Sequence, residues 1–492
     1  MKTILARSVA FLLVFVFVAS PVGATCGGGG GGGGGGTSGT GSTGGSDPVV
    51  YHVPWKAPLT EKETPTSAGI ILYWFPASID EIKKSSLKES RDLSLYAGQC
   101  VSMYLADGRT PNADKLIGES KLPVAVLTTP DGTPINKVEN KDGKLKVTDV
   151  EKLVGGEIKT RETALDGKLK EAKSKADAGD NSTAIALYKT VAAEKCMFPK
   201  KAKDAASALK KLGAENIGSI PSSPIFDAAI SAQIVRTMKR GLRAENAAKY
   251  VLADKLYTQA QNLDPADPTP IRYLAELHRH DTGDWEKAKM EFHQILDMPA
   301  DPLSRAVAMH GLGKITIHEG EFKKGLHLME DSVATYPLPL AYRNLAVYWN
   351  SEGDLVQGNY YTEKALAIDP KDPYNLVFAA VFMAANGKKD EALKVAMANI
   401  NLLPASYNLA AIFAQNGQKD KALELLKRHF YKYERYQEVR TKEMMEARVD
   451  FMFNSIRHDA DFLALTKDAD GRIPMVMSPK QMTTTQDMKM NQ

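Results

Sequence analysis

The stretch AYRNLAVYWNSEGDLVQGNYYTEKALAIDP, from Ala341 to Pro370, decides the fold of this chain. Its first half has apolar residues at helical spacing, and its second half has small residues at the same spacing. Gly353 supplies a permissive backbone between the halves, and Pro370 ends the second because proline lacks an N–H. The stretch therefore predicts two antiparallel helices. Their expected facing residues are Leu345, Ala346, Trp349, Gly358, Thr362 and Ala365.

This unit recurs along the second half of the chain. Turn glycines and exit prolines both recur at intervals of about 33 residues, and a period of this length predicts stacked helical hairpins. The glycines are Gly320, Gly353, Gly387 and Gly417, and the prolines are Pro337, Pro370 and Pro404. Because such arrays usually present extended binding surfaces, the repeat makes binding the leading function.

These residues resemble the tetratricopeptide repeat family between about Ser231 and Phe430. The strongest copies are AYRNLAVYWNSEGD and SYNLAAIFAQNGQKDKAL, whereas the copy around Ala248 lacks a turn glycine. The resemblance implies an all-α solenoid of about five to seven hairpins over residues 219–430. It also implies a groove that binds a protein or peptide partner.

Composition and charge describe an ordinary globular protein. The chain has 492 residues, of which 43% are apolar and 25% charged, and its formal net charge is +4. This length has room for about three domains. The near-neutral balance provides no electrostatic case for nucleic acid binding.

The first 25 residues have the pattern of a signal peptide. Lys2 and Arg7 precede an apolar run from Val9 to Ala19, and small residues follow it. The run is too short to span a bilayer stably. Residues 26–48 are then rich in glycine, serine and threonine and predict a flexible tether.

Cys26 at the start of this tether resembles the lipidated cysteine of bacterial lipoproteins, although Gly23 and Thr25 depart from the family pattern. The resemblance implies lipidation of Cys26 and a membrane-anchored protein in the cell envelope. The alternative is an ordinary cut after Ala24, which would release a periplasmic or secreted soluble protein.

Residues 49–160 predict an α/β domain. Strands are expected at 69–75, 100–107 and 124–129, with helices at 78–90 and 113–121 between them. The pair Asp131 and Gly132 predicts a hairpin turn, and a closing helix is expected near 147–154.

This domain resembles the thioredoxin-like fold, through the first strand ILYWFP and through Leu122 and Pro123 before the third strand. The resemblance implies that Pro123 occupies the family's cis-proline position. The family's thiol pair should follow the first strand, where the chain instead has Phe75, Pro76, Ala77 and Ser78. Ser78 is better explained as a helix N-cap, so we expect no catalytic residue here.

The other two cysteines, Cys100 and Cys196, are too far apart to form a CxxC pair. We expect each to be buried separately as a small apolar residue. A disulfide between them is the alternative in an exported protein.

Helices are expected on both sides of the repeats. Residues 161–218 predict a helical bridge with one irregular hairpin that turns at Gly179, and residues 431–473 predict capping helices. Residues 474–492 are expected to be disordered.

Side chains of the first helices that point away from the packing positions define the predicted groove. They are Tyr273, His310, Lys314, Arg343, Asn344, Tyr374, Tyr407 and Asn408. The cationic members could receive a carboxylate of the partner. Asn344 and Asn408 also occupy a position that is often asparagine in this family for structural reasons.

The histidines near residues 278–281 do not have a metal-binding spacing, and no cofactor motif is present in the sequence. The expected function is an exported, membrane-tethered interaction scaffold without catalysis. The alternatives are an atypical thiol-disulfide or thioredoxin-like envelope enzyme and a structural component of envelope assembly.

Overall fold

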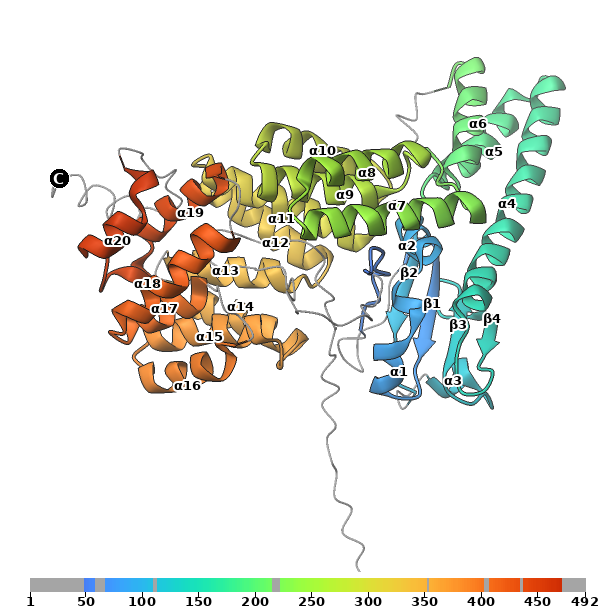
Figure 1. Ribbon diagram of the computed structural model, residues 1–492. Coiled ribbons are helices and arrows are strands. Elements are labelled where there is room, and N and C mark those ends of the chain that lie inside the picture. The colour runs from blue at the N-terminus through green and yellow to red at the C-terminus, as the bar shows by residue number, and fades with distance from the viewer. Residues whose placement is uncertain are drawn as a thin grey trace, which may run out of the picture. The chain divides into compact units, whose positions relative to one another are not determined.

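The computed structural model describes residues 48–57, 67–108, 113–214, 222–351, 354–401, 407–433 and 437–470 (Figure 1). The expected signal peptide, almost all of the tether and the expected disordered tail lie outside these residues. The same holds for Cys26, Gly353 and Pro404.

The chain forms two compact units that divide between Leu338 and Pro339. The division falls inside the expected repeat region, 219–430, rather than at either of its limits. The first unit contains the α/β domain, the helical bridge and the earlier hairpins, and the second contains the later hairpins and the capping helices.

A four-stranded sheet forms the centre of the α/β domain. Its strands are β1 (Ile70–Phe75), β2 (Val101–Leu105), β3 (Val124–Thr128) and β4 (Pro134–Glu139). They lie in the order β2-β1-β3-β4, with β1 parallel to β2 and antiparallel to β3, and with β3 antiparallel to β4. The expected strands and the hairpin turn are therefore confirmed, with Gly132 at a φ of 86° in that turn.

The single helix expected at 78–90 is wrong. The structure has a short helix α1 (Ile79–Lys84), a 3-10 turn η1 (Ser86–Lys88) and a separate helix α2 (Arg91–Gly98). Serines cause the interruption, because the Ser85 Oγ accepts a hydrogen bond from Leu87 N and the Ser90 Oγ accepts one from Leu93 N. Each serine thereby caps a new helical segment. Helix α3 (Ala113–Ile117) follows β2.

The closing helix begins where expected but is much longer. Helix α4 runs over Val147–Asp177, so the expected limit between residues 160 and 161 lies inside one element. Val150 and Val154 are buried in its first part, near the sheet. Its second part pairs with α5 (Asn181–Ala193) after a turn at Gly179, and α6 (Pro199–Lys211) packs beside them. The second part of α4 and α5 thus form a hairpin around Gly179.

Six helical hairpins follow within the described residues, as the repeat period predicts. In the first unit their helices are α7 (Ala228–Asn246), α8 (Tyr250–Leu263), α9 (Pro268–Glu276) continued by the π-helix η2 (Leu277–Thr282), α10 (Trp285–Asp297), α11 (Pro302–His318) and α12 (Phe322–Thr335). In the second they are α13 (Pro339–Ser351), α14 (Leu355–Ile368), α15 (Pro373–Ala385), α16 (Lys389–Asn399), α17 (Tyr407–Gln415) and α18 (Lys419–Arg428).

In both units, first helices of successive hairpins contact one another. Helix α9 packs against α11, and α15 packs against both α13 and α17. The turns show why the glycines recur, since Gly320, Gly387 and Gly417 have φ angles of 95°, 86° and 72°. Ala248 adopts the same left-handed conformation, with a φ of 55°, in the copy that lacks a turn glycine.

Further helical elements complete the second unit. The π-helix η3 (His429–Tyr433) leads to α19 (Gln437–Val449), the 3-10 turn η4 (Phe451–Phe453), α20 (Ala460–Leu465) and the 3-10 turn η5 (Lys467–Ala469). Phe453, Ile456 and Phe462 are buried in one cluster with Phe413 of α17 and Phe430 of η3. These helices therefore cover the apolar face that the last hairpin would otherwise expose.

Candidate partner-binding residues and the domain junction

The eight side chains of the predicted groove divide between the two units. In the first unit, Tyr273 lies on α9 while His310 and Lys314 lie on α11, and all three are buried. In the second unit, Asn344, Tyr407 and Asn408 are buried, whereas Arg343 on α13 and Tyr374 on α15 are half-buried. Arg343 and Tyr374 are therefore the members of this set that present most surface to a partner.

Arg343 connects two successive hairpins. Its Nη1 donates a hydrogen bond to Asn375 Oδ1 over 2.6 Å. The Asn375 Nδ2 in turn donates to the carbonyl oxygens of Ala365 and Asp369, over 2.9 and 3.1 Å. The guanidinium is thus positioned by the link between α14 and α15, and a positioned arginine loses little side-chain entropy on binding an anion.

Tyr407 holds the capping helices against the last hairpin. Its hydroxyl donates to Asp450 Oδ2 over 3.0 Å, and its ring meets the Phe453 ring edge to face at 5.1 Å. Burial, followed by the nearby Asp450 carboxyl, raises the pKa of Tyr407. A buried pair of His429 and Glu443, 2.8 Å apart, adds a second polar contact in the same region.

His278, which lies in the π-helix η2, contacts three charged side chains. His278 Nδ1 lies 2.7 Å from Glu291 Oε2, and His278 Nε2 lies 3.2 Å from Asp254 Oδ2 and 3.0 Å from Lys287 Nζ. Burial lowers the pKa of His278, but the contacts with Glu291 and Asp254 outweigh it and the net direction is upward. His278 therefore joins α8, η2 and α10.

A buried arginine joins the α/β domain to the hairpins of the first unit. Arg91, at the start of α2, donates from Nη2 to Asp264 Oδ2 over 2.5 Å and from Nε to Asp267 Oδ2 over 2.9 Å. Its Nη1 donates to the Ile225 carbonyl over 2.8 Å and to Ser231 Oγ over 2.7 Å. All three charged side chains are almost completely buried.

Further contacts at this junction come from the segment that precedes the sheet. The Tyr51 hydroxyl donates to Asp267 Oδ2 over 2.6 Å, and Tyr51 packs in the apolar cluster of α7, α8 and α9. Gly98, at the end of α2, lies so close to the backbone of Pro299 and Asp301 that a side chain there would be crowded. The α/β domain is therefore packed onto the hairpins rather than joined to them by the chain alone.

Sequence reasoning missed this junction. The only signal was a pair of aspartates, Asp264 and Asp267, each directly before a proline in the segment that follows α8. Such residues are common at helix starts, and Asp267 does cap α9 by accepting a hydrogen bond from Thr269 N. Nothing local indicates that Arg91 is their partner.

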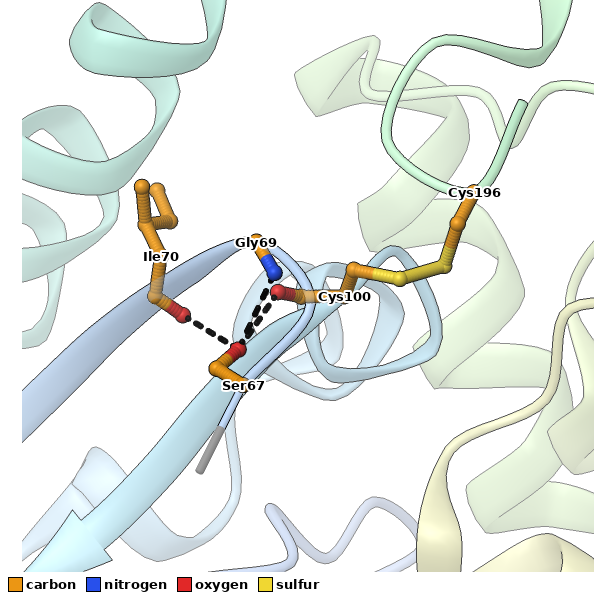
Figure 2. The surroundings of a disulfide bond; sticks show 5 residues. All are labelled: Ser67, Gly69, Ile70, Cys100 and Cys196. Carbon is orange, nitrogen blue, oxygen red and sulfur yellow. Dashed lines mark hydrogen bonds between the residues drawn. A yellow bond between two sulfur atoms is a disulfide. The ribbon is translucent and has the colours of Figure 1, made fainter. Parts of the chain in front are cut away.

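The expectation that Cys100 and Cys196 are buried separately is wrong, because they form a disulfide. Figure 2 shows the bond between the residue that precedes β2 and the turn that leads to α6. Beside it, the Ser67 hydroxyl donates to the carbonyl oxygens of Ile70 and Cys100, each over 3.3 Å. The bridge ties the sheet to the helical bridge across 96 positions of sequence.

The segment after β1, where the thioredoxin-like resemblance would imply a thiol pair, forms a helix cap. Ser78 Oγ accepts a hydrogen bond from Glu81 N over 3.2 Å, which confirms the N-cap interpretation. The Glu81 carboxylate accepts from Ala77 N over 2.7 Å and from Trp74 Nε1 over 3.3 Å, and burial raises its pKa. Across the sheet, the Leu122–Pro123 peptide is cis, as the resemblance implies, and precedes the pairing of Val124 with Phe75.

The described residues contain neither a membrane-spanning helix nor a cluster of metal-binding side chains. In that part of the chain, no helix is both long and apolar enough to cross a bilayer. Within the same residues, no group of three or more His, Cys, Asp or Glu side chains is arranged to hold a metal ion.

No protein-family model matches the chain, and no curated protein matches its sequence. Several solved structures resemble part of the fold, among them the following two. PilW, described as a widely conserved type IV pilus biogenesis factor, is 16% identical, with 51% of this chain and 98% of PilW covered and a TM-score of 0.31. The human IFIT1 dimer with m7Gppp-AAAA is also 16% identical, with 69% and 66% covered and a TM-score of 0.24. Because both TM-scores are low, neither structure indicates the function of this chain. The function is therefore inferred from the geometry of the chain itself.

Proposed function

We propose that the helical hairpins bind a protein or peptide partner, as tetratricopeptide repeats do. One observation carries the proposal: α9 lies beside α11 in the first unit, and α13, α15 and α17 lie side by side in the second. Residues on those helices therefore form a continuous surface, and half-buried Arg343 and Tyr374 of the second unit contribute a cation and an aromatic ring to it. An extended peptide or a helix with a carboxylate suits such a surface.

We further propose that the α/β domain is a thioredoxin-like domain without redox catalysis. The strand order, the parallel pairing of β1 with β2 and the cis Pro123 support the fold. The cap at Ser78 stands where the family has a reactive thiol. Cys100 precedes Val101, which pairs with Ile70 at the opposite end of β1, so the disulfide is remote from that position. The domain would then serve as a rigid support for the hairpins.

Export and anchoring complete the proposal. The pattern of residues 1–25 supports export, and Cys26 followed by the glycine-rich tether supports a lipid anchor. A disulfide between residues 96 positions apart supports an oxidising compartment, where such bonds persist.

Affinity capture from native envelopes tests the binding surface. Arg343→Ala and Tyr374→Ala should each lower partner recovery, whereas Lys371→Ala, an exposed residue near the start of α15, should not. Thermal unfolding of each variant must match the wild type, so that loss of recovery reports binding. Equal recovery of one partner by all four proteins would refute this surface.

Two further measurements test the other parts. Fatty-acid labelling should mark the wild type and disappear in Cys26→Ser, and unchanged labelling would exclude this anchor. Insulin reduction should not exceed the uncatalysed rate, and a clear rate that is lost in Cys100→Ala/Cys196→Ala would favour a thiol-disulfide enzyme instead.

A further inference from the structure

Helix α6 of the helical bridge carries as much net charge as the whole chain. Its 13 residues contain five lysines and one acidic residue, Asp204, so its net charge is +4. The 492 residues of the chain together also have a net charge of +4, so the charges of all other residues balance. The basic character of the protein is therefore concentrated on this helix.

Four of the five lysines lie on one face of α6. The helix packs against α5 and α4, and its residues Ala202, Ala205 and Leu209 are buried along one side (Figure 1). At 3.6 residues per turn, the opposite face covers about 100° of the helix circumference. This lysine face consists of four exposed lysines, namely Lys200, Lys203, Lys210 and Lys211, together with exposed Ser207, and exposed Asp204 lies at its margin.

The ammonium groups of the lysine face have no acidic partner. Within the described ranges of the chain, none of these four lysines forms an ion pair. The fifth lysine of α6 differs, because Lys201 Nζ lies 2.6 Å from Asp166 Oδ1 and 3.5 Å from Glu162 Oε1 of α4. Lys201 thus stabilises the bridge, whereas the lysine face presents four uncompensated charges to an external group.

The lysine face suits a layer of phosphate groups better than another protein. It contains no apolar or aromatic side chain, and such side chains are the buried anchors of most protein interfaces. Four neighbouring like charges repel one another, and an anionic surface would relieve this repulsion. An ammonium group binds a phosphate as a point charge, so a fluid layer of headgroups can satisfy it without one fixed geometry.

We propose that the lysine face of α6 docks on a membrane surface of anionic phospholipid headgroups. The inference rests on the proposed export and lipid anchor, which would bring the protein to such a surface. The 22 residues 26–47 would reach at most about 75 Å. Helix α4, which runs from the sheet to the bridge, has 31 residues and is about 46 Å long. A lipid on Cys26 and the lysine face can therefore reach the same membrane.

Vesicle sedimentation tests the lysine face without the anchor. The protein used is the chain from residue 26 onward with Cys26→Ser, which has neither the expected signal peptide nor the proposed lipid site. It should sediment with vesicles that contain phosphatidylglycerol and stay in solution with pure phosphatidylcholine. At about 1 M salt it should be released, because the screening length falls to about 3 Å.

Two matched variants locate the binding. Lys203→Gln/Lys210→Gln should weaken binding to the anionic vesicles by roughly thirtyfold, because each lysine near an anionic surface contributes about fivefold. Lys388→Gln/Lys389→Gln removes two exposed lysines of the second unit, which also form no ion pair within the described residues, and should bind like the parent protein. Thermal unfolding should be the same for all three proteins.

Three results would overturn the proposal. They are equal binding by the two variants, binding that does not require phosphatidylglycerol, and absence of binding to the anionic vesicles. A soluble polyanion is the competing partner. If single-stranded DNA binds with the same dependence on Lys203 and Lys210 while the vesicles do not bind, the face serves such a ligand and membrane docking is wrong.

These outcomes are distinguishable from failure of the proposed anchor. If Cys26 is labelled with fatty acid but the vesicles are not bound, anchoring stands and the lysine face has no membrane role. If the vesicles are bound through Lys203 and Lys210 but Cys26 is not labelled, membrane docking stands and the lipid anchor is wrong.

Discussion

Arg91 Nε donates a hydrogen bond to Asp267 Oδ2 over 2.9 Å, and this buried ion pair joins residues 176 positions apart. Asp264 accepts from the same guanidinium, so one cation compensates two buried carboxylates. The pair connects the α/β domain with the hairpins of the first unit. If one partner were removed, the charge of the other would remain buried without compensation, and this would destabilise the fold.

Arg91→Ala should lower the free energy of unfolding by about 3–5 kcal/mol, because Asp264 and Asp267 would remain buried without a cation. Urea unfolding measures this loss. Arg161→Ala, which removes a partly exposed pair with Glu157 on α4, should cost less than about 1 kcal/mol. Similar losses in the two variants would contradict the central role of Arg91.

Loss of the disulfide should also destabilise the first unit. Cys100→Ala/Cys196→Ala should lower the free energy of unfolding by about 2–5 kcal/mol, since the bond closes a loop of 96 residues in the unfolded chain. Non-reducing mass spectrometry of the wild type should show the bond. A reductant should destabilise the wild type but not the double variant, and an equal response of both proteins would exclude a stabilising bond.

Ala248→Gly should stabilise the protein. Ala248 has a φ of 55°, a region that costs a residue with a side chain about 1 kcal/mol and glycine much less. Thermal unfolding should therefore show a gain of roughly 0.5–1 kcal/mol, reduced by the greater freedom of glycine in the unfolded chain. Ala247→Gly is the matched control, because Ala247 has a φ of −89° and should gain nothing.

The His278 contacts should make stability depend on pH. The folded-state pKa of His278 is raised, so its contribution is complete below the unfolded value of about 6.5 and is lost as pH rises through the higher folded value. The free energy of unfolding should therefore fall above pH of about 6.5 in the wild type. His278→Gln should fall less over this range, whereas His293→Gln, which changes an exposed histidine, should follow the wild type.

The hairpins could be predicted because their determinants are local. A turn residue such as Gly387 meets its conformational requirement within a few residues, and the small residues that let two helices approach recur at fixed spacing. At Gly358, for example, any side chain would collide with the Asn350 amide of the preceding helix. The prediction was wrong between Ser85 and Ser90, where two local signals compete. The residue pattern favours one continuous helix, but the two serine side chains cap new helical segments and interrupt it.

The predicted site was less accessible to sequence reasoning. The register of the repeat identified the helices that carry Tyr273, Lys314 and Arg343. It did not indicate how exposed these side chains are, because their burial depends on the neighbouring hairpins.

The sequence by itself determined that this chain contains an α/β domain and a series of hairpins, because helix limits, turns and strand alternation depend on neighbouring residues. Only the tertiary structure decided that Cys100 meets Cys196 and that Arg91 meets Asp267. Cys26 is another cysteine that could pair with Cys100, and the chain has 59 acidic residues that could pair with Arg91. Which of them does so depends on the packing of segments about 100 or more residues apart, and no local pattern encodes that choice.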